Sequence, residues 1–315
     1  MGSPCCPRPQ LLAEYGLHLF QKGPVVRPEL DTSSPAFSVT EAAMHSFASA
    51  KDPRMAHVMQ LMVKHLHAFV AEAKLSKEEW LAGLKFLTAC ADITTADRNE
   101  FSLLSDIMGI SSMVDVVSLP PNCTPSSVLG PFHNHDSHER ENGADITDGQ
   151  PGKRVWLHGR VVNGQGQAIA NATLDFWQNA DNGLYPAQDP AQDPHNLRCK
   201  IHTDANGRFE LLTIEPKPYT VPTDGPVGEL LRQSNRHEWR PAHFHVIVSA
   251  PGYIGLVTEL FPAHSEHIQN DTVFGVRPGL IVSMQPCHDA AVASRYGLKE
   301  PFDEVQFEFC LAKDH

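Results

Sequence analysis

The sequence predicts a mainly β protein, an antiparallel β-sandwich that follows an N-terminal helical domain. Up to about residue 125, apolar residues recur at steps of three and four, which is the period of amphipathic helices. After residue 150 the period changes to two, and turn dipeptides interrupt short runs, as expected for strands. Evenly spaced strands with no helices between them favour a sandwich over a parallel α/β sheet.

The N-terminal helices have recognisable start signals. Ser38 followed by Glu41 is a capping-box pattern and predicts the start of a short helix. The pair Asp52-Pro53 predicts a second start, because aspartate caps helices and proline is favoured in their first turn. One apolar face runs along this second helix, and such a face is more often core than a ligand site; it comprises Met55, Val58, Met62, Leu66, Phe69 and Ala73.

Two more helices are expected before residue 125. Ser76 with Glu79 forms another capping-box pattern, and apolar residues at helical spacing follow it. A last helix from about Ala96 should end at Gly109, since glycine is favoured just after helix ends. The expected domains are therefore a flexible segment, a helical domain and a sandwich domain, at residues 1–36, 37–125 and 126–315.

The second half of the chain contains short strand-like runs. Two strong turn dipeptides, Asn163-Gly164 and Asn206-Gly207, separate some of them. The runs are rich in β-branched and aromatic residues, which fit a half-buried pleated surface. Strands are predicted at Val155–Val162, Leu174–Gln178, Phe209–Ile214, His243–Ser249, Leu256–Phe261 and Leu280–Met284.

Composition limits the partners and the compartment. The 315 residues carry a net charge of −12, so nucleic acid and anionic membranes are poor partners without a basic patch, and the sequence shows none. The sequence has no apolar run of the length that membrane insertion requires, and its start lacks the layout of a signal peptide. With seven cysteines and no C-x-x-C pair, a cytoplasmic protein with reduced thiols is expected.

The segment Trp239–His245 contains two histidines separated by one residue. In a strand, His243 and His245 project from the same face, so their ring nitrogens can converge on a metal. Alternate histidines on a solvated strand face are the simpler alternative. The pair therefore predicts a metal site only in combination with further ligands.

Two tyrosines could supply those ligands. Tyr185 and Tyr219 lie in Gly/Pro-rich loops, and loops on a rigid scaffold often carry ligands. With the imidazoles they make an oxygen and nitrogen donor set without thiolate, which suits hard ferric iron better than structural zinc. A phenol ionises at about pH 10, so ligation at neutral pH requires a highly charged metal.

Around these residues the chain resembles the intradiol ring-cleaving dioxygenases, non-haem iron enzymes that open aromatic diols with O₂. The resemblance covers about residues 125–285 and, more loosely, the helices before them. By position it makes Tyr185, Tyr219, His243 and His245 the Fe(III) ligands. It is carried by Trp156–Val161, Gly166–Ala172, Asp175–Gln178, Asn196–Arg198, Thr203-Asp204 and Arg240–His243.

The resemblance also implies catalytic roles beside the iron. Tyr219 would leave the iron when substrate chelates and accept a substrate proton. Arg240, three residues before His243, would stabilise negative charge on the ring; a structural ion pair is its alternative role. Glu259 stands where catechol-cleaving members usually have Gln, and it could pair with Arg240, bind a third substrate hydroxyl or weakly reach iron.

Two segments, Ser127–Phe132 and Asp271–Arg277, resemble the branch that cleaves hydroxyquinol (1,2,4-trihydroxybenzene) to 3-hydroxymuconate and maleylacetate. Cleavage of catechol to cis,cis-muconate is the alternative. The expected pocket residues also have simpler interpretations: helix core for Leu103, a local polar contact for Asp106 and a plain turn for Val128–Pro131. The expected substrate contacts are Leu103, Asp106, Val128, Leu129, Gly130, Pro131 and Val273.

In the resembling family the equivalent helices form a dimer interface with a bound phospholipid, so the resemblance implies a homodimer and a lipid between its subunits. Two other classes stay open. A zinc hydrolase could use His243, His245 and Glu259, and a binding module could keep the scaffold without turnover. The stretch His133–His138 is a rival metal site, but a solvated loop is the favoured interpretation.

Overall fold

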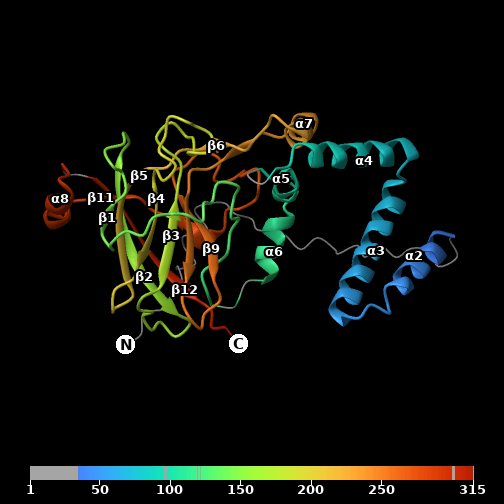
Figure 1. The fold of residues 1–315 in the computed structure, drawn as a ribbon, viewed down its shortest axis with the longest axis horizontal. Helices are drawn as coiled ribbons and strands as arrows, with labels where there is room; N and C mark the ends of the chain where they lie inside the picture. Colours follow the sequence, from blue (N-terminus) through green and yellow to red (C-terminus); the bar gives the residue numbers. More distant parts are fainter. Residues whose placement is uncertain (1–34, 96–97, 119, 121, 300–301, 315) are drawn as a thin grey trace. The chain divides into compact units, whose positions relative to one another are not determined.

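A computed structural model describes residues 35–314 of the chain, apart from 96–97, 119, 121 and 300–301 (Figure 1). The expected flexible segment therefore lies almost wholly outside the described residues. Backbone contacts divide the chain into two compact units, whose described parts are residues 35–89 and 90–314. The domain boundaries expected from the sequence stay a prediction.

The first unit is helical, and local signals start two of its helices as expected. Asp52 caps the second helix by accepting a hydrogen bond from the Arg54 amide. Ser76 and Glu79 form the reciprocal bonds of a capping box before the third. The helices are α2 (Pro35–Ser46), α3 (Pro53–Ala73) and α4 (Lys77–Asp92), of which α4 continues past residue 89.

The capping box expected at Ser38 is wrong. Helix α2 begins earlier, at Pro35, and the Ser38 hydroxyl donates to the Pro35 carbonyl inside the first turn. Proline is favoured at the first helical position, because it lacks an amide hydrogen that would be left unpaired there. The proline, rather than the capping-box pattern at Ser38, therefore decides where helix α2 begins.

The single helix expected to end at Gly109 is shorter, and a second helix follows it. Asn99 caps α5 (Glu100–Ile107) by accepting from two backbone amides. Gly109, with φ of 71°, turns the chain, and α6 (Ile110–Ser118) starts directly after it. No single helix in the described ranges is long and apolar enough to cross a bilayer; α5 and α6, bent by 71°, meet that length and composition test only as a pair.

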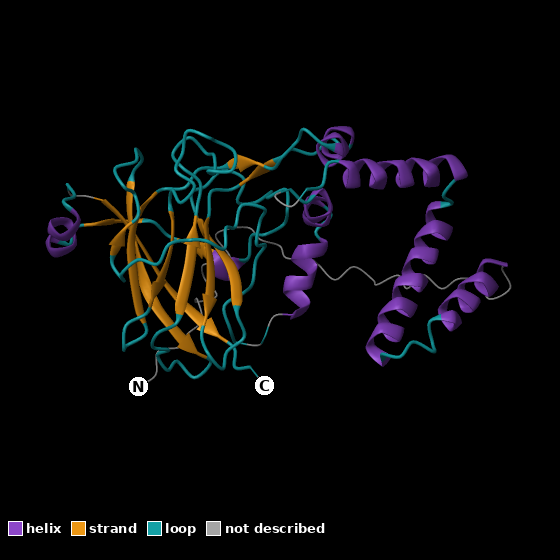
Figure 2. Cartoon of the chain, viewed as in Figure 1, coloured by secondary structure: helices purple, strands orange, loops and turns teal. Residues whose placement is uncertain are grey.

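The second unit contains two five-stranded sheets, drawn in orange in Figure 2. One sheet has the order β1-β5-β2-β12-β11, the other has the order β10-β9-β8-β3-β4, and β6 pairs with β7 in a small third sheet. Three short helical segments connect strands: α7 (Pro226–Gln233), η1 (Pro278–Leu280) and α8 (Ala290–Tyr296). The strands are β1 (Ala144–Asp145), β2 (Arg154–Asn163), β3 (Thr173–Trp177), β4 (Arg198–His202), β5 (Arg208–Ile214), β6 (Tyr219–Thr220), β7 (Trp239–Arg240), β8 (Phe244–Ser249), β9 (Leu256–Pro262), β10 (Ile281–Val282), β11 (Gln285–Cys287) and β12 (Phe302–Leu311).

The core lies between the two large sheets. Leu157 of β2 and Phe309 of β12 share one buried cluster with Phe176 of β3 and Val246 of β8, and each of the four is at most 1% exposed. Apolar side chains from both sheets thus meet in a single layer, which is the defining feature of a sandwich. The predicted fold class is confirmed.

Three strand pairings are parallel, so the sheets are mixed rather than wholly antiparallel. They join β1 to β5, β9 to β10 and β2 to β12. Among the strands of five or more residues, β4 and β12 were not predicted, nor were several shorter ones, and β12 comes from the far end of the chain. A parallel partner that distant leaves no signal in the local apolar period, because the period reports only which face of a strand is buried.

The close approach of β2 and β12 predicts a strong effect of one substitution. Gly159 lies opposite Phe307, and a Cβ at this position would lie 1.6 Å from the Phe307 carbonyl oxygen. We expect Gly159→Ala to force the strands apart and to lower the free energy of unfolding by about 3 kcal/mol or more, since backbone cannot move aside as a side chain can. Urea unfolding measures the loss.

Gly164→Ala is the matched control, because a Cβ at Gly164 would meet no atom within 4 Å. It should change the free energy of unfolding by less than about 0.5 kcal/mol. Equal stability of the two variants would contradict the pairing of β2 with β12.

Candidate metal centre

The four candidate ligands come from three places in the second unit. His245 lies in β8, and His243 immediately precedes that strand. Tyr219 is the first residue of β6, and Tyr185 lies in the loop between β3 and β4. All four are buried, with at most 5% of their surface exposed.

The structure brings these four rings into one cluster. The ring centroids of Tyr185 and Tyr219 are 5.4 Å apart, and those of Tyr219 and His243 are 5.5 Å apart. The Nε2 atoms of His243 and His245 are separated by 3.1 Å. The two histidines therefore do not occupy a solvated strand face; their ring nitrogens converge in the interior.

The backbone sets the tautomer of His243. Its Nδ1 lies 2.8 Å from the Pro241 carbonyl oxygen, which can only accept, so Nδ1 carries the hydrogen and Nε2 keeps a lone pair. Metal-binding histidines commonly donate a hydrogen bond from their other ring nitrogen in this way. Burial, together with the nearby Arg240, lowers the pKa of His243 to about 3, so the ring is neutral at neutral pH.

Burial shifts the pKa values of the two phenols in the opposite direction, upward. It raises the pKa of Tyr219 to about 12 against the charge of Arg240, and it raises the pKa of Tyr185 well above its usual value. The Tyr185 hydroxyl is buried and has no hydrogen-bond partner among the described residues. Such a hydroxyl is costly, and a highly charged metal ion that replaced its proton would remove the cost. The donor set therefore fits a trivalent metal ion.

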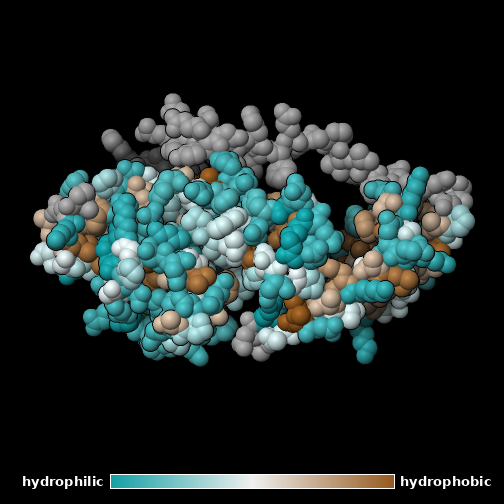
Figure 3. Space-filling model, turned by 90° about the horizontal axis from the view of Figure 1, so that it is seen from above, coloured by the Kyte–Doolittle hydropathy of each residue, from teal (hydrophilic) through white to brown (hydrophobic). Residues whose placement is uncertain are grey.

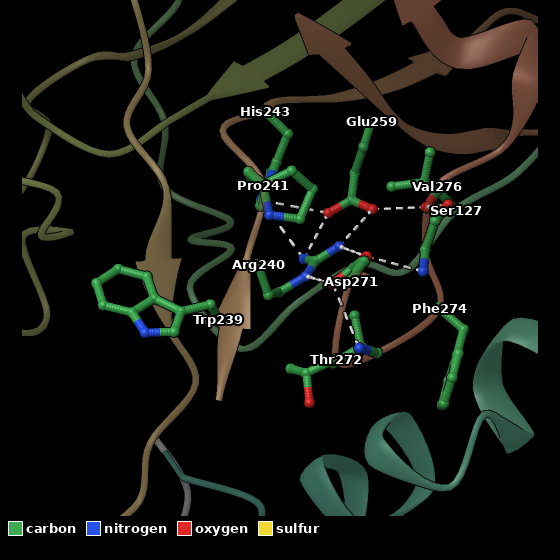
Figure 4. A network of polar contacts seen from close by, with 12 residues as sticks. Ser127, Trp239, Arg240, Pro241, His243, Glu259, Asp271, Thr272, Phe274 and Val276 are labelled. Atoms are coloured by element: carbon green, nitrogen blue, oxygen red, sulfur yellow. Dashed lines mark hydrogen bonds and ion pairs between the residues drawn. The ribbon is translucent and has the colours of Figure 1, made fainter. Parts of the chain in front are cut away.

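Arg240 lies beside this cluster, between two carboxylates (Figure 4). Its guanidinium donates to Glu259 at 2.7 and 3.1 Å and to Asp271 at 3.1 and 3.2 Å. All three residues are buried. Removing one partner of a buried ion pair costs about 3–5 kcal/mol, because the remaining charge is left without compensation. Arg240 is thus fixed both in charge and in position.

Glu259 has further contacts, among them one with His245, whose Nδ1 lies 3.6 Å from its Oε1. The Ser127 hydroxyl donates to its Oε2 at 2.5 Å, and its Oε1 lies 3.3 Å from Nε2 of His243. Burial alone would raise the pKa of Glu259, but Arg240 and Ser127 help to outweigh burial, and the pKa is lowered. Of the three roles open to Glu259, pairing with Arg240 is the one that the structure forms.

Glu259 also bears on the zinc alternative. In the part of the chain that the structure describes, His243, His245 and Glu259 are the group of His, Cys and carboxylate side chains close enough to share a metal. The carboxylate of this group is already bound by Arg240 and Ser127, whereas the Tyr185 hydroxyl is unpaired. This difference favours the two tyrosines and two histidines, rather than the group with Glu259, as the metal ligands.

The loop after Asp271 closes over the guanidinium. The Gly275 amide donates to Asp271 at 2.9 Å. A Cβ on Gly275 would lie 2.7 Å from Nη2 of Arg240 and 3.0 Å from oxygens of both carboxylates. Glycine is therefore required at this position by the close approach of the backbone to the ion pair.

A narrow pocket of about 10 Å³ opens onto Tyr219 and Arg240. Val221 and Pro222, which the sequence did not indicate, form part of its wall. A wider cavity of about 890 Å³ shares several of its lining residues, and Leu129 lines this cavity rather than the pocket. The other expected substrate contacts all line the narrow pocket: Leu103, Asp106, Val128, Gly130, Pro131 and Val273.

Asp106 is the carboxyl group of the narrow pocket. Burial raises its pKa, although the Ser111 hydroxyl and the charge of Arg240 act against that rise. Apart from Tyr219 and Arg240, the same pocket is otherwise lined by apolar residues such as Leu103, Val128 and Val273. One acceptor among apolar walls can orient a small ligand that carries a hydroxyl group.

Sequence reasoning missed Ser127, Asp271 and Trp177 as site residues. Each lies in a segment that carries the resemblance, but its contact depends on how distant segments meet. Trp177 lies opposite His245 in the sheet, and its indole stacks on that imidazole at 4.6 Å. A signal for such contacts would require the strand register, which local patterns do not contain.

The interpretation of His133–His138 as a solvated loop is wrong for His133. Its side chain is only 7% exposed, and Nε2 lies 3.0 Å from a carboxylate oxygen of Asp175. Its ring also packs against Trp177 at 4.7 Å. Strand β3 places both partners beneath the loop, whereas His135 and His138 are exposed as expected.

The chain was compared with known families and structures. A family model described as "Dioxygenase" matches residues 128–313, and "Catechol dioxygenase N terminus" matches residues 52–121. The chain is 38% identical to hydroxyquinol 1,2-dioxygenase of a Rhizobium species, over 87% of this chain and 94% of that protein. The structure of hydroxyquinol 1,2-dioxygenase from Pseudomonas putida matches with a TM-score of 0.80 and 39% identity, over 89% of this chain and 99% of that one. Catechol 1,2-dioxygenase from Acinetobacter radioresistens matches with a TM-score of 0.75 and 27% identity, over 90% and 95%.

Proposed function

Since the chain belongs to the intradiol ring-cleavage dioxygenases, we propose that it cleaves hydroxyquinol between the two carbons that carry adjacent hydroxyls. Both atoms of O₂ enter the product, 3-hydroxymuconate, whose keto form is maleylacetate. One observation carries this proposal. The four buried side chains of Tyr185, Tyr219, His243 and His245 converge beside a narrow pocket with one carboxyl group, Asp106.

The proposed cofactor is a non-haem ferric ion held by those four side chains. When bound, it would supply a Lewis acid that chelates the adjacent hydroxyls of the substrate and lowers their pKa. Two phenolates and two imidazoles suit such a hard ion. The unpaired Tyr185 hydroxyl and the lone pair on His243 Nε2 support this assignment.

Tyr219 is the proposed acceptor of a substrate proton. It lines the narrow pocket and lies opposite Arg240 in the β6–β7 pair, beside the space where a substrate hydroxyl would bind. Its pKa of about 12 means that the phenol holds a transferred proton at neutral pH. Proton transfer to this oxygen would therefore be favourable.

Arg240 is proposed to stabilise negative charge that develops on the substrate. A guanidinium keeps its charge at any pH at which the protein is folded. Glu259 and Asp271 hold it in place between them, and its Nη1 lies 3.4 Å from Nε2 of His243. A fixed charge of this kind needs no reorganisation during the reaction, which makes it more effective than water.

Asp106 is proposed to select the trihydroxylated ring. Its carboxylate would accept a hydrogen bond from the third hydroxyl, which catechol lacks. The apolar side chains of Leu103, Val128 and Val273 would pack on the ring and exclude water.

The first test is the visible spectrum of the iron-loaded protein, because phenolate bound to ferric iron absorbs visible light. We expect a band that shifts when hydroxyquinol is added without oxygen and that bleaches when air is admitted. Tyr185→Phe should weaken the band, and zinc-loaded protein should be colourless.

Two outcomes would contradict the assignment. A shift with catechol alone would identify cleavage of catechol to cis,cis-muconate instead. Bound iron without a visible band would mean that Tyr185 and Tyr219 are not ligands, and the zinc hydrolase or binding-module alternatives would then apply.

The role of Asp106 predicts a change in substrate preference. Asp106→Asn keeps the shape of the side chain but removes its charge, and a hydrogen bond to a charged group contributes about 1.5–3 kcal/mol. We expect kcat/KM for hydroxyquinol to fall by about 10- to 100-fold, while kcat/KM for catechol changes little. Steady-state kinetics with both substrates measures the ratio.

Asp115→Asn is the matched control for this variant. Asp115 lines the wider cavity but not the narrow pocket, so its substitution should leave the ratio unchanged. An equal loss of activity toward both substrates in Asp106→Asn would argue against a contact with the third hydroxyl.

A homodimer through the helical unit, with a phospholipid on its apolar surface, is part of the same proposal. Helices α3 and α4 expose many large apolar side chains, and hydrophobic residues appear brown in Figure 3. Contiguous exposed apolar surface commonly marks an interface. The exposed residues, each more than 40% exposed, are Met55, Val58, Leu61, Met62, Leu66, Phe69, Val70, Trp80, Leu81, Leu84 and Leu87.

Native mass spectrometry would check the second subunit and the phospholipid in one measurement. We expect twice the chain mass of 34.7 kDa, with an additional mass that organic extraction removes. A lipid-free monomer at micromolar concentration would contradict the proposal. The cytoplasmic location stays a prediction.

A further inference from the structure

Arg198, the first residue of β4, is a buried cation without an ion-pair partner in the described part of the chain. It is 4% exposed, and its Nη1 and Nη2 each lie 3.4 Å from the Phe132 carbonyl oxygen. Its Nε has no hydrogen-bond partner among the described residues. The buried acid Asp175 acts on Arg198 through space but is hydrogen-bonded to His133. A buried guanidinium with so little compensation is unfavourable unless an anion forms nearby.

Strand register places Arg198 in one row with the candidate metal centre. Trp177 lies opposite Arg198 on one side and opposite His245 on the other. His245 in turn lies opposite Glu259. The row therefore runs across four strands, from a guanidinium through an indole and an imidazole to a carboxylate, and all four side chains are buried.

Phe132 connects Arg198 to the tyrosines. Its carbonyl accepts from Arg198, and its ring stacks on Tyr185 with centroids 4.5 Å apart. The same ring meets Tyr219 edge-on at 6.2 Å. The contact that holds the Phe132 backbone thus also holds the ring that covers Tyr185.

We propose that Arg198 is a positioning residue: it holds Phe132 against Tyr185, and its buried charge acts on the oxygen that Tyr185 would present to the metal. The inference rests on the proposed function, in which Tyr185 is a ligand. Arg240, the other cation near Tyr185, is already matched by Glu259 and Asp271. Among the described residues, Arg198 has only Asp175, which also binds His133, as an acidic neighbour, so the phenolate would add to the compensation of its charge.

The electrostatics of Tyr185 agree with this arrangement. Burial, the neighbouring Tyr219 and Glu259 raise its pKa, whereas Arg240 and, with a smaller effect, Arg198 act to lower it. Coulombic effects of this kind are strong in the interior, because few water molecules screen them.

The test replaces Arg198 with residues that separate charge from hydrogen bonding. Arg198→Gln keeps a donor for the Phe132 carbonyl but removes the charge, and Arg198→Lys keeps the charge. A positive charge lowers the energy of the phenolate donor orbitals, so its loss should move the phenolate-to-iron band to longer wavelength. We expect this shift in Arg198→Gln and Arg198→Met, and a band close to that of the unmodified protein in Arg198→Lys.

Lys200→Met is the matched control. Lys200 lies on the same strand and donates to the His135 carbonyl at 2.6 Å, so it anchors the same loop from a partly exposed position. Its substitution should leave the band unchanged. Thermal unfolding of each iron-loaded variant shows whether it is folded, and Arg198→Gln provides the result if Arg198→Met does not fold.

The outcomes separate this inference from the function on which it rests. Iron-loaded unmodified protein without a visible band would overturn both. A band in the unmodified protein that stays in place in Arg198→Gln would overturn the inference alone, as would an equal shift in Lys200→Met.

Discussion

The ion pair between Arg240 and two buried carboxylates joins the elements that carry the site. Arg240 lies in register with Tyr219, Glu259 lies in register with His245, and Asp271 belongs to the loop that closes over the guanidinium. A planar guanidinium binds two carboxylates in a fixed geometry. Because an uncompensated buried charge costs several kcal/mol, displacement of any one of these elements is penalised. The ion pair therefore sets the positions of the strands that present Tyr219 and the histidines.

Around this ion pair the site combines fixed charges with groups that are neutral in the bare protein. Burial keeps His243 unprotonated and the phenol of Tyr219 protonated at neutral pH. A neutral imidazole is ready to bind a metal ion, whereas a phenol must first lose its proton, so a highly charged ion is required. The same high pKa would later let Tyr219 hold a proton taken from the substrate. Burial thus supports both the proposed choice of metal and the proposed proton transfer.

Aromatic rings form a further layer behind the candidate ligands. Trp177 stacks on His245, and Phe132 stacks on Tyr185. Both rings depend on β3 and β4, since Trp177 belongs to β3 and Arg198 of β4 holds the Phe132 carbonyl. Rigid neighbours of this kind restrict the orientation of a ligand ring, which is a requirement for a precise metal geometry.

By itself the sequence determined the fold class, and it indicated the four side chains that converge and most of the residues that line the narrow pocket. Apolar periods, the cap at Asp52 and the His243–His245 spacing depend on residues close together in the chain, where local geometry decides the outcome. Only the tertiary structure decided that Glu259 binds Arg240, that His133 binds Asp175 and that β12 runs parallel to β2. These contacts join residues from separate segments, and their register follows from how the buried faces of the two sheets pack together.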